Sequence, residues 1–294
     1  MKISGVSFVR NAIKLGYPVE ESLRSLLPVC DEIVVAVGNS DDGTLELVKS
    51  IDPKIRIIET VWDDSKREGG RVLAEQTDIA LKEATGDWCL YLQADEVLHE
   101  EDYDKIRPEF LKSDKDKNVE ALIFRYKHFY GSYEYIGGGR QWYRREIRAF
   151  KNTGNVVSWG DAQGFRKKNP NGEIEKLKAK QTELQIFHYG WVRPPKAQQL
   201  KQQAFQRLYH DDSWLEENIS KDDEFDYDSA YELEVFGGKH PEIMRERIEH
   251  DREWTQRFDF KRVKKKPILV KITDEIEKRT GWRIGEYRNF TEVK

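Results

Sequence analysis

The stretch Gly86-Asp-Trp-Cys-Leu-Tyr-Leu-Gln-Ala-Asp-Glu-Val-Leu98 decides the fold of this 294-residue chain. It opens at a glycine turn, continues as an apolar run over 88–92, and ends in the polar residues Gln93, Asp95 and Glu96. An apolar run of this length after a glycine predicts a strand buried on both faces, as in a parallel sheet. In open α/β sheets, ligands bind beyond the carboxyl ends of the strands. We therefore expect Asp95 and Glu96 at the mouth of a binding site.

The segments before this stretch alternate between predicted strands and helices. Strands are expected at Ile3–Val9, Glu32–Val37 and Ile55–Val61, and helices at Glu20–Pro28, Thr44–Ser50 and Arg71–Ala84. Such alternation is typical of a doubly wound parallel sheet. The predicted fold class is therefore α/β, with a Rossmann-like, mostly parallel central sheet flanked by helices.

The chain changes in character after Glu96. Further strands are expected at Glu120–Tyr126, Arg144–Phe150 and Leu184–Tyr189. Between the first two of these lies 130–142, which is rich in glycine and aromatic residues and is expected to be a mobile loop. From about residue 194 onward the chain is expected to be mostly helical.

The composition excludes several classes of protein. Lys and Arg number 50 and Asp and Glu 54, a net charge of -4, whereas nucleic-acid-binding proteins usually carry a basic excess. We therefore expect no nucleic-acid partner. The two cysteines, Cys30 and Cys89, lie in apolar segments, which favours a reducing, cytoplasmic compartment over a disulfide framework. No apolar run is long enough to cross a bilayer, and the first ten residues lack the features of a signal peptide.

Polar residues follow three of the predicted strands, and in a parallel sheet these strand ends share one edge. Asn11 follows the first strand, and the loop with Ser40 and Asp42 follows the second. Ser40 and Asp42 could hydrogen-bond a base or a ribose, but such residues are equally common in turns and at helix starts. Asp95 could hold a hard divalent cation, although acidic residues also favour the first turn of a helix.

Four segments together resemble the family 2 nucleotide-sugar glycosyltransferases, which have the GT-A fold. They are Val6–Asn11, Ile33–Thr44, Leu73–Ala80 leading into Gly86-Asp-Trp88, and Leu92–Val97. In that family the last segment contains Asp-x-Asp, whose carboxylates hold a metal against the donor diphosphate. The resemblance covers residues 1–100 and extends more loosely to about 193 through His188-Tyr-Gly-Trp-Val-Arg193.

The resemblance implies a metal-dependent, inverting transferase that moves a sugar from a nucleotide diphosphate to an acceptor hydroxyl, in polysaccharide or glycoconjugate assembly. It implies a GT-A domain over 1–195, with a nucleotide-binding half at 1–100 and an acceptor half at 101–195, and a helical extension over 196–294. The expected donor is a UDP-sugar, the acceptor a glycan or lipid-linked sugar, and the cofactor Mn²⁺ or Mg²⁺. The residues expected around the nucleotide are Asn11, Ser40, Asp42, Gln76, Asp78 and Gln93.

Two departures from the family pattern bear on the donor site. Val37 and Gly38 stand where the family usually has two acids, one of which contacts the base. Gln93 stands where the first Asp of Asp-x-Asp is expected, and a neutral amide is a poorer metal ligand than a carboxylate. Asp95 is therefore the expected metal ligand, helped by Gln93 and His188, and Glu96 could compensate directly or through water. The alternative for His188 is a structural histidine packed beside its aromatic neighbours.

An inverting transfer needs a general base near the acceptor hydroxyl. Asp161 is the expected base, with Glu134 and Glu146 as rivals, and an ordinary turn residue is the alternative. The absent acids at 37, 38 and 93 also favour a second hypothesis, a catalytically decayed nucleotide- or glycan-binding module. A sugar-phosphate nucleotidyltransferase is a third, although the Gly-rich basic loop expected after the first strand of that class is absent.

The C-terminal part offers two further expectations. The basic run 261–266 could approach the inner face of an anionic membrane, or it could be a solvated connector. The segment 281–287 could dock back on the body of the protein or pair subunits in a homodimer.

Overall fold

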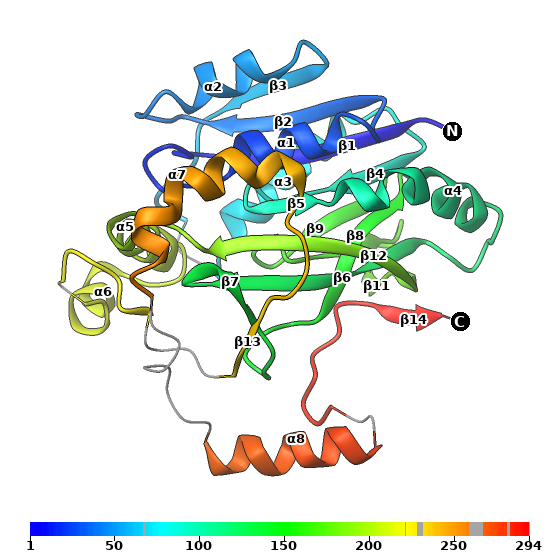
Figure 1. The fold of residues 1–294 in the computed structure, drawn as a ribbon. Helices are drawn as coiled ribbons and strands as arrows, with labels where there is room; N and C mark the ends of the chain where they lie inside the picture. The colour runs from blue at the N-terminus through cyan, green and yellow to red at the C-terminus, as the bar shows by residue number, and fades with distance from the viewer. Residues whose placement is uncertain (67–68, 221, 228–231, 259–266, 281–282, 294) are drawn as a thin grey trace.

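The computed structural model describes residues 1–294 except 67–68, 221, 228–231, 259–266, 281–282 and 294. Within these residues, eleven strands join in one sheet, and β9 (Val156–Trp159), β10 (Gly164–Lys168) and β11 (Ile174–Lys176) form a second, three-stranded sheet. Helices flank the large sheet (Figure 1). The mixed α/β class and the mostly parallel central sheet are those that the sequence predicts.

The first half of the large sheet is parallel and has the order β4-β1-β2-β3. Its strands begin and end close to the predicted positions: β1 (Ile3–Val9), β2 (Glu32–Gly38), β3 (Ile55–Thr60) and β4 (Trp88–Tyr91). The connecting helices are α1 (Val19–Leu26), α2 (Thr44–Ile51) and α3 (Arg71–Lys82). This arrangement brings the residues that follow β1, β2 and β4 to one edge.

The two faces of this half carry separate cores because side chains alternate along a strand. In β2, Ile33 and Val35 pack on the side that includes apolar residues of α1, α2 and α4 (Tyr103–Asp114). Val34 and Ala36 pack on the opposite side, against α3. The strand is therefore buried on both faces, which fixes the position of the loop that follows it.

The second half of the sheet is mainly antiparallel. β8 (Arg145–Lys151) pairs with β4, and β6 (Ala121–Tyr130) pairs with β8. The long strand β12 (Lys178–Trp191) runs parallel to β6 and pairs with the short strand β5 (Glu96–Leu98). The expected mobile loop over 130–142 is wrong in part, because it contains β7 (Ser132–Gly137), which forms a hairpin with β6 and buries Tyr133. The further strand β13 (Leu233–Val235) pairs with β7.

The remaining helices follow β12 or precede β6. They are η1 (Glu100–Asp102), α5 (Pro195–Gln206), α6 (Asp212–Asn218), η3 (Glu242–Met244), α7 (Arg245–Thr255) and α8 (Ile268–Thr280). No helix in the described ranges is both long and apolar enough to span a membrane. The predicted division at residue 195 stays a prediction, and the last strand, β14 (Thr291–Val293), pairs with β12 of the main sheet.

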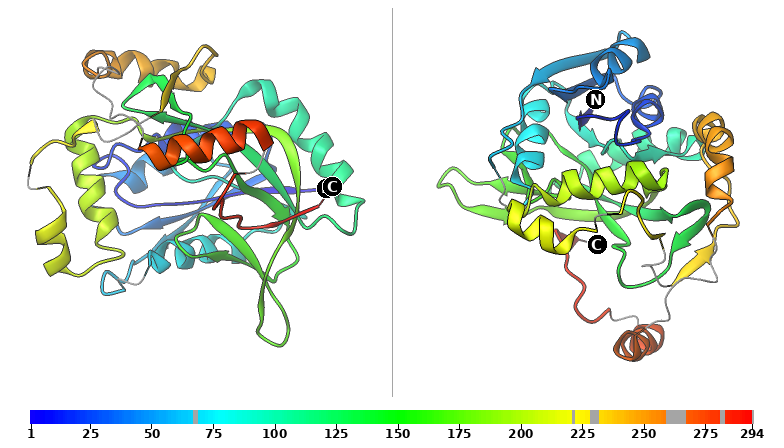
Figure 2. Two further views of the ribbon diagram at one scale, coloured as in Figure 1. Left: turned by 90° about the horizontal axis from the view of Figure 1, so that it is seen from below. Right: turned by 90° about the vertical axis from the view of Figure 1, so that its left-hand side faces the viewer.

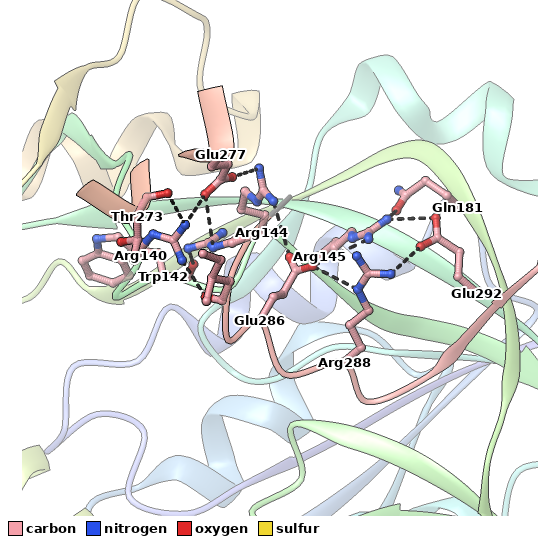
Figure 3. A network of polar contacts seen from close by, with 12 residues as sticks. Arg140, Trp142, Arg144, Arg145, Gln181, Thr273, Glu277, Glu286, Arg288 and Glu292 are labelled. Carbon is pink, nitrogen blue, oxygen red and sulfur yellow. Dashed lines mark hydrogen bonds and ion pairs between the residues drawn. The ribbon is translucent and has the colours of Figure 1, made fainter. Parts of the chain in front are cut away.

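Helix α8 lies at the end of the molecule opposite α2 and β3 (Figures 1 and 2). Charged groups attach it to the body. Arg140 Nε lies 2.8 Å from Asp274 Oδ1. Arg144 Nη1 lies 2.8 Å from Glu277 Oε1 (Figure 3). Arg283, from the segment 281–287, donates to the carbonyl of Trp142. The described part of that segment thus contacts the body. The basic run 261–266 lies outside the described residues.

Candidate functional site

A cavity of about 690 Å³ opens at the carboxyl edge of β1 and β4. Residues of α5 and the turn after it, over 200–208, form another part of its wall. Five of the residues predicted for the site line this cavity although they are distant in sequence: Asn11, Gln93, Asp95, Asp161 and His188. The structure therefore brings together the expected metal, donor and base candidates in one space, while their roles stay predictions.

Pairing between β5 and β12 places His188 beside Asp95. His188 stands opposite Glu96 in this antiparallel pair, and the Tyr189 amide donates a hydrogen bond to the Asp95 carbonyl at 2.8 Å. As a result, His188 Nε2 lies 3.7 Å from Asp95 Oδ1. Two residues 93 positions apart in the sequence meet because a three-residue strand forms directly after Asp95.

The protonation of His188 follows from its neighbours. His128 Nε2 lies 2.7 Å from the Tyr143 carbonyl, which can only accept, so that nitrogen carries the proton. His128 Nδ1 is then the acceptor for His188 Nδ1–H at 2.9 Å. Burial lowers the pKa of His188 to about 4, although Asp95 opposes this shift. His188 is therefore neutral at pH 7 and presents the lone pair of Nε2 toward Asp95.

Two cations face the other oxygen of Asp95. Arg193 Nη2 and Lys201 Nζ lie 3.5 Å and 3.6 Å from Asp95 Oδ2. Burial by itself would raise the pKa of Asp95, but the positive charges of Lys201 and Arg193 outweigh it and lower that pKa. Asp95 is thus ionised, with Oδ2 near the cations and Oδ1 toward the imidazole.

Glu96 is not available to a metal, contrary to the suggestion that it compensates for Gln93. Arg148 binds both of its carboxylate oxygens, through Nε at 2.9 Å and Nη2 at 2.8 Å. Tyr126 donates a further hydrogen bond at 2.7 Å, and the side chains of Glu96 and Arg148 are fully buried. Successive side chains of an extended segment point to opposite sides. Asp95 therefore faces the cavity, whereas the adjacent Glu96 faces the buried Arg148.

Gln93 and Asp161 both line the cavity, and Gln93 contacts the loop that carries Asp161. Gln93 Nε2 donates to the carbonyl of Ala162 at 3.3 Å, and Tyr209 donates to Asp161 Oδ2 at 2.8 Å. The backbone at Ala162 is left-handed (φ 64°), which marks a tight turn beside Asp161. Gln93 is thus connected to the loop that carries the expected base.

The loops after β1 and β2 bind each other. The backbone of Asn11 is left-handed (φ 53°), and its backbone N–H donates a hydrogen bond to Ser40 Oγ at 3.0 Å. Asp42 accepts from the Lys14 amide at 2.7 Å and from Thr44 Oγ1 at 2.5 Å. Ser40 and Asp42 do not line the cavity, and their observed bonds are those of a turn and a helix start.

Other predicted candidates lie away from the cavity lining. Gln76 is buried and accepts from Thr60, and Asp78 accepts from the Ser158 amide at 2.7 Å. Burial raises the pKa of Asp78. Of the rival bases, Glu146 is buried against Asn289, and Glu134 is exposed on β7. We carry none of these four into the proposals below.

The sequence did not point to Lys201, Tyr209 or the role of Arg193. Lys201 and Tyr209 lie in a charged helical region with many similar residues, so no local pattern separates them. Arg193 belongs to the segment 188–193, which carries the family resemblance. Its place in that segment was the one sequence feature that could have indicated a role in the site. Trp62 and Arg10, which stack at 5.4 Å, also line the cavity.

The residues near Asp95 fit a divalent cation with two protein ligands. Among the described residues, no three His, Cys, Asp or Glu side chains group as a metal site. Asp95 Oδ1 and His188 Nε2 are nevertheless two acceptors that face each other at 3.7 Å. A carboxylate oxygen and a neutral imidazole suit Mn²⁺, and phosphate oxygens or water would complete the coordination.

Comparison with known proteins establishes the family. Residues 17–169, more than half of the 294-residue chain, match glycosyl transferase family 2. The chain belongs to that family, and its fold is the GT-A type. No curated protein matches the chain.

Several solved structures are similar to parts of the chain. TarS from S. aureus in complex with UDP is 22% identical with a TM-score of 0.34, over 44% of this chain and 36% of that chain. The mannosyltransferase PcManGT from Pyrobaculum calidifontis, in complex with GDP-Man and Mn²⁺, is 15% identical with a TM-score of 0.42, over 87% and 70%. Glucosyl-3-phosphoglycerate synthase from Mycobacterium tuberculosis, in complex with Mn²⁺, UDP and phosphoglyceric acid, is 18% identical with a TM-score of 0.29, over 44% and 43%. The chain thus spans little more than a third of the TarS chain that it matches.

Proposed function

We propose that this protein transfers a sugar from a nucleotide diphosphate donor to an acceptor hydroxyl with inversion at the anomeric carbon. The observation that carries the proposal is the single cavity that unites Asn11, Gln93, Asp95, Asp161 and His188 at the carboxyl edge of the sheet. Membership of glycosyl transferase family 2 supports it. A UDP-sugar is the donor that we propose, and a glycan or lipid-linked sugar is the acceptor.

In the proposed reaction, the acceptor oxygen attacks the anomeric carbon from the side opposite the diphosphate. A new C–O bond forms, the bond to the diphosphate breaks, and its electron pair leaves on the phosphate oxygen. Asp161 accepts the proton of the acceptor hydroxyl, and the hydrogen bond from Tyr209 holds its carboxylate in position. Asn11 and Gln93, which line the cavity, are the residues that we propose to contact the donor.

Asp95 and His188 would hold a divalent cation, Mn²⁺ or Mg²⁺. When bound, the cation would offset the negative charge that develops on the leaving diphosphate. Arg193, whose side chain is fully buried, positions Asp95 by approaching its Oδ2 atom and by donating to the Leu15 and Gly190 carbonyls. His128 fixes the His188 tautomer.

Binding and hydrolysis measurements test the proposal. Isothermal titration with UDP and with GDP should show binding when Mn²⁺ is present, and absence of binding to both would contradict the donor site. Slow hydrolysis of the donor that needs Mn²⁺ and is abolished in Asp95→Ala favours the enzyme. Donor binding with no hydrolysis or transfer favours the decayed binding module, which Gln93 in place of an acid supports.

The setting of the reaction is also part of the proposal. We propose that the protein acts in the cytoplasm, in polysaccharide or glycoconjugate assembly, and contacts the inner face of the membrane if its acceptor is lipid-linked. Chromatography with light scattering would test the homodimer. Flotation with vesicles that contain anionic lipid would test the membrane contact.

A further inference from the structure

Lys201 reaches the cavity from α5, outside the segment 17–169 that matches the family. Its side chain is 14% exposed, and its ammonium lies 5.6 Å from the ring centre of Tyr17 and 5.7 Å from that of Trp191. Burial lowers the pKa of Lys201 to about 7, with Arg193 acting in the same direction and Asp95 against it. This lysine is therefore placed where water screens its charge little.

The ammonium of Lys201 has hydrogen-bonding capacity left for a ligand. Within the described part of the chain, Nζ donates to the Gly190 carbonyl at 3.0 Å. Its 3.6 Å separation from Asp95 Oδ2 is an ion-pair distance, longer than a hydrogen bond. An ammonium group carries three N–H donors, so two can turn toward the cavity.

With Lys201 protonated, the charges around Asp95 leave a surplus of one positive charge. Asp95 contributes one negative charge, Arg193 and Lys201 contribute two positive charges, and His188 is neutral. Arg193 donates to the Leu15 and Gly190 carbonyls, stacks on Tyr17 at 4.5 Å, and does not line the cavity. The surplus charge therefore faces the cavity through Lys201.

We propose that Lys201 binds the diphosphate of the donor directly, as a second positive charge beside the cation held by Asp95 and His188. The inference rests on the proposed function, which places the diphosphate next to Asp95. Nζ lies 3.6 Å from that carboxylate and is thus within reach of phosphate oxygens at the same site. Because Gln93 contributes no charge to a metal, a lysine at this position makes donor binding less dependent on the cation. The protein therefore binds nucleoside diphosphates measurably without a divalent metal.

Isothermal titration of the full chain with UDP and with uridine, in EDTA and in Mn²⁺, tests this role. We expect Lys201→Gln to weaken UDP binding by about 10- to 100-fold in both buffers, the loss of one charge-assisted contact. Uridine binding should not change, because uridine has no phosphate. Lys196→Gln is the matched control, since Lys196 is an exposed lysine on the same helix.

The outcomes separate this inference from the proposed function. If Lys201→Gln binds UDP as tightly as Lys196→Gln, or if the unaltered protein binds UDP only when Mn²⁺ is present, Lys201 is not a diphosphate ligand and the proposed function stands. If neither UDP nor GDP binds in either buffer, the proposed function fails and the inference with it.

Two further measurements keep the test decisive if Lys201→Gln folds poorly, which its thermal unfolding would reveal. Lys201→Arg should retain UDP binding, because the charge is preserved. Inorganic pyrophosphate should compete with UDP for the unaltered protein in EDTA. Lack of competition would overturn the inference, because pyrophosphate carries the group that Lys201 is proposed to bind.

Discussion

Replacing Glu96 by glutamine should strongly destabilise the protein. The side chains of Glu96 and Arg148 are fully buried, and Arg148 donates to both carboxylate oxygens. In Glu96→Gln the guanidinium of Arg148 keeps its charge but loses its counter-charge. One carboxylate oxygen that accepted a hydrogen bond from Arg148 becomes an NH₂ group, so two donors face each other. Breaking a buried pair in this way costs about 3–5 kcal/mol. At about 2–4 °C per kcal/mol, the melting temperature should fall by about 6–20 °C.

Urea unfolding followed by circular dichroism at pH 7 measures this loss. Glu20→Gln is the matched control, because the Arg24–Glu20 pair is exposed and should contribute about 0.3–0.5 kcal/mol. The double variant Glu96→Leu/Arg148→Met should recover much of the loss, since it leaves no buried charge unpaired. A loss below about 1 kcal/mol in Glu96→Gln would refute the reasoning, because that value is typical of a solvated pair.

Three further predictions concern the base, the glycine behind it and the buried histidines. Asp161→Asn should slow transfer by about 10²–10⁴-fold in a product assay while UDP affinity stays the same, and a full rate would exclude Asp161 as the base. Gly70→Ala should lower the free energy of unfolding by about 1 kcal/mol or more in a urea titration, because φ is +68° and a Cβ would lie 2.9 Å from that of Asp161. Gly154→Ala, at φ +75° with no atom within 4 Å, is its control and should show the smaller loss from strain alone, so equal losses would contradict the steric argument. Burial lowers the pKa of both His188 and His240 to about 4, so the unfolded chain binds protons that the folded chain does not. The contribution of these two histidines to the free energy of unfolding should be fully present above pH 6.5. It should fall toward pH 4 by up to about 1.4 kcal/mol per pH unit for each histidine. Urea titrations at several pH values should show a smaller slope for His240→Gln.

The parallel half of the fold could be predicted because its signals are local. Each of β1, β2 and β4 is a short apolar run that ends at a turn or a polar residue, and buried parallel strands have that pattern. The hairpin strand β7 could not be found in this way, because glycine-rich sequence around it also suits a loop. What makes β7 a strand is the burial of Tyr133 and its pairing with β6, and both depend on distant residues.

The candidate site could be predicted at Asp95, His188 and Asp161, which line the same cavity. Each of these residues follows or ends a recognisable strand or turn. The separation of Asp95 from Glu96 could not be predicted, because the partner of Glu96 is Arg148, 52 residues away. Lys201 could not be predicted either, since only the packing of α5 over the strand edge distinguishes it from Lys196, the other lysine of that helix.

The two tryptophans in the cavity wall should make the intrinsic fluorescence of this protein sensitive to ligand binding in the cavity. Trp62 and Trp191 are two of eight tryptophans, and each lies against a cation, Arg10 at 5.4 Å and Lys201 at 5.7 Å. Indole emission responds to nearby charge, so a ligand that draws either cation away should change the fluorescence of unlabelled protein. Trp62→Phe and Trp191→Phe would show which end of the cavity fills first.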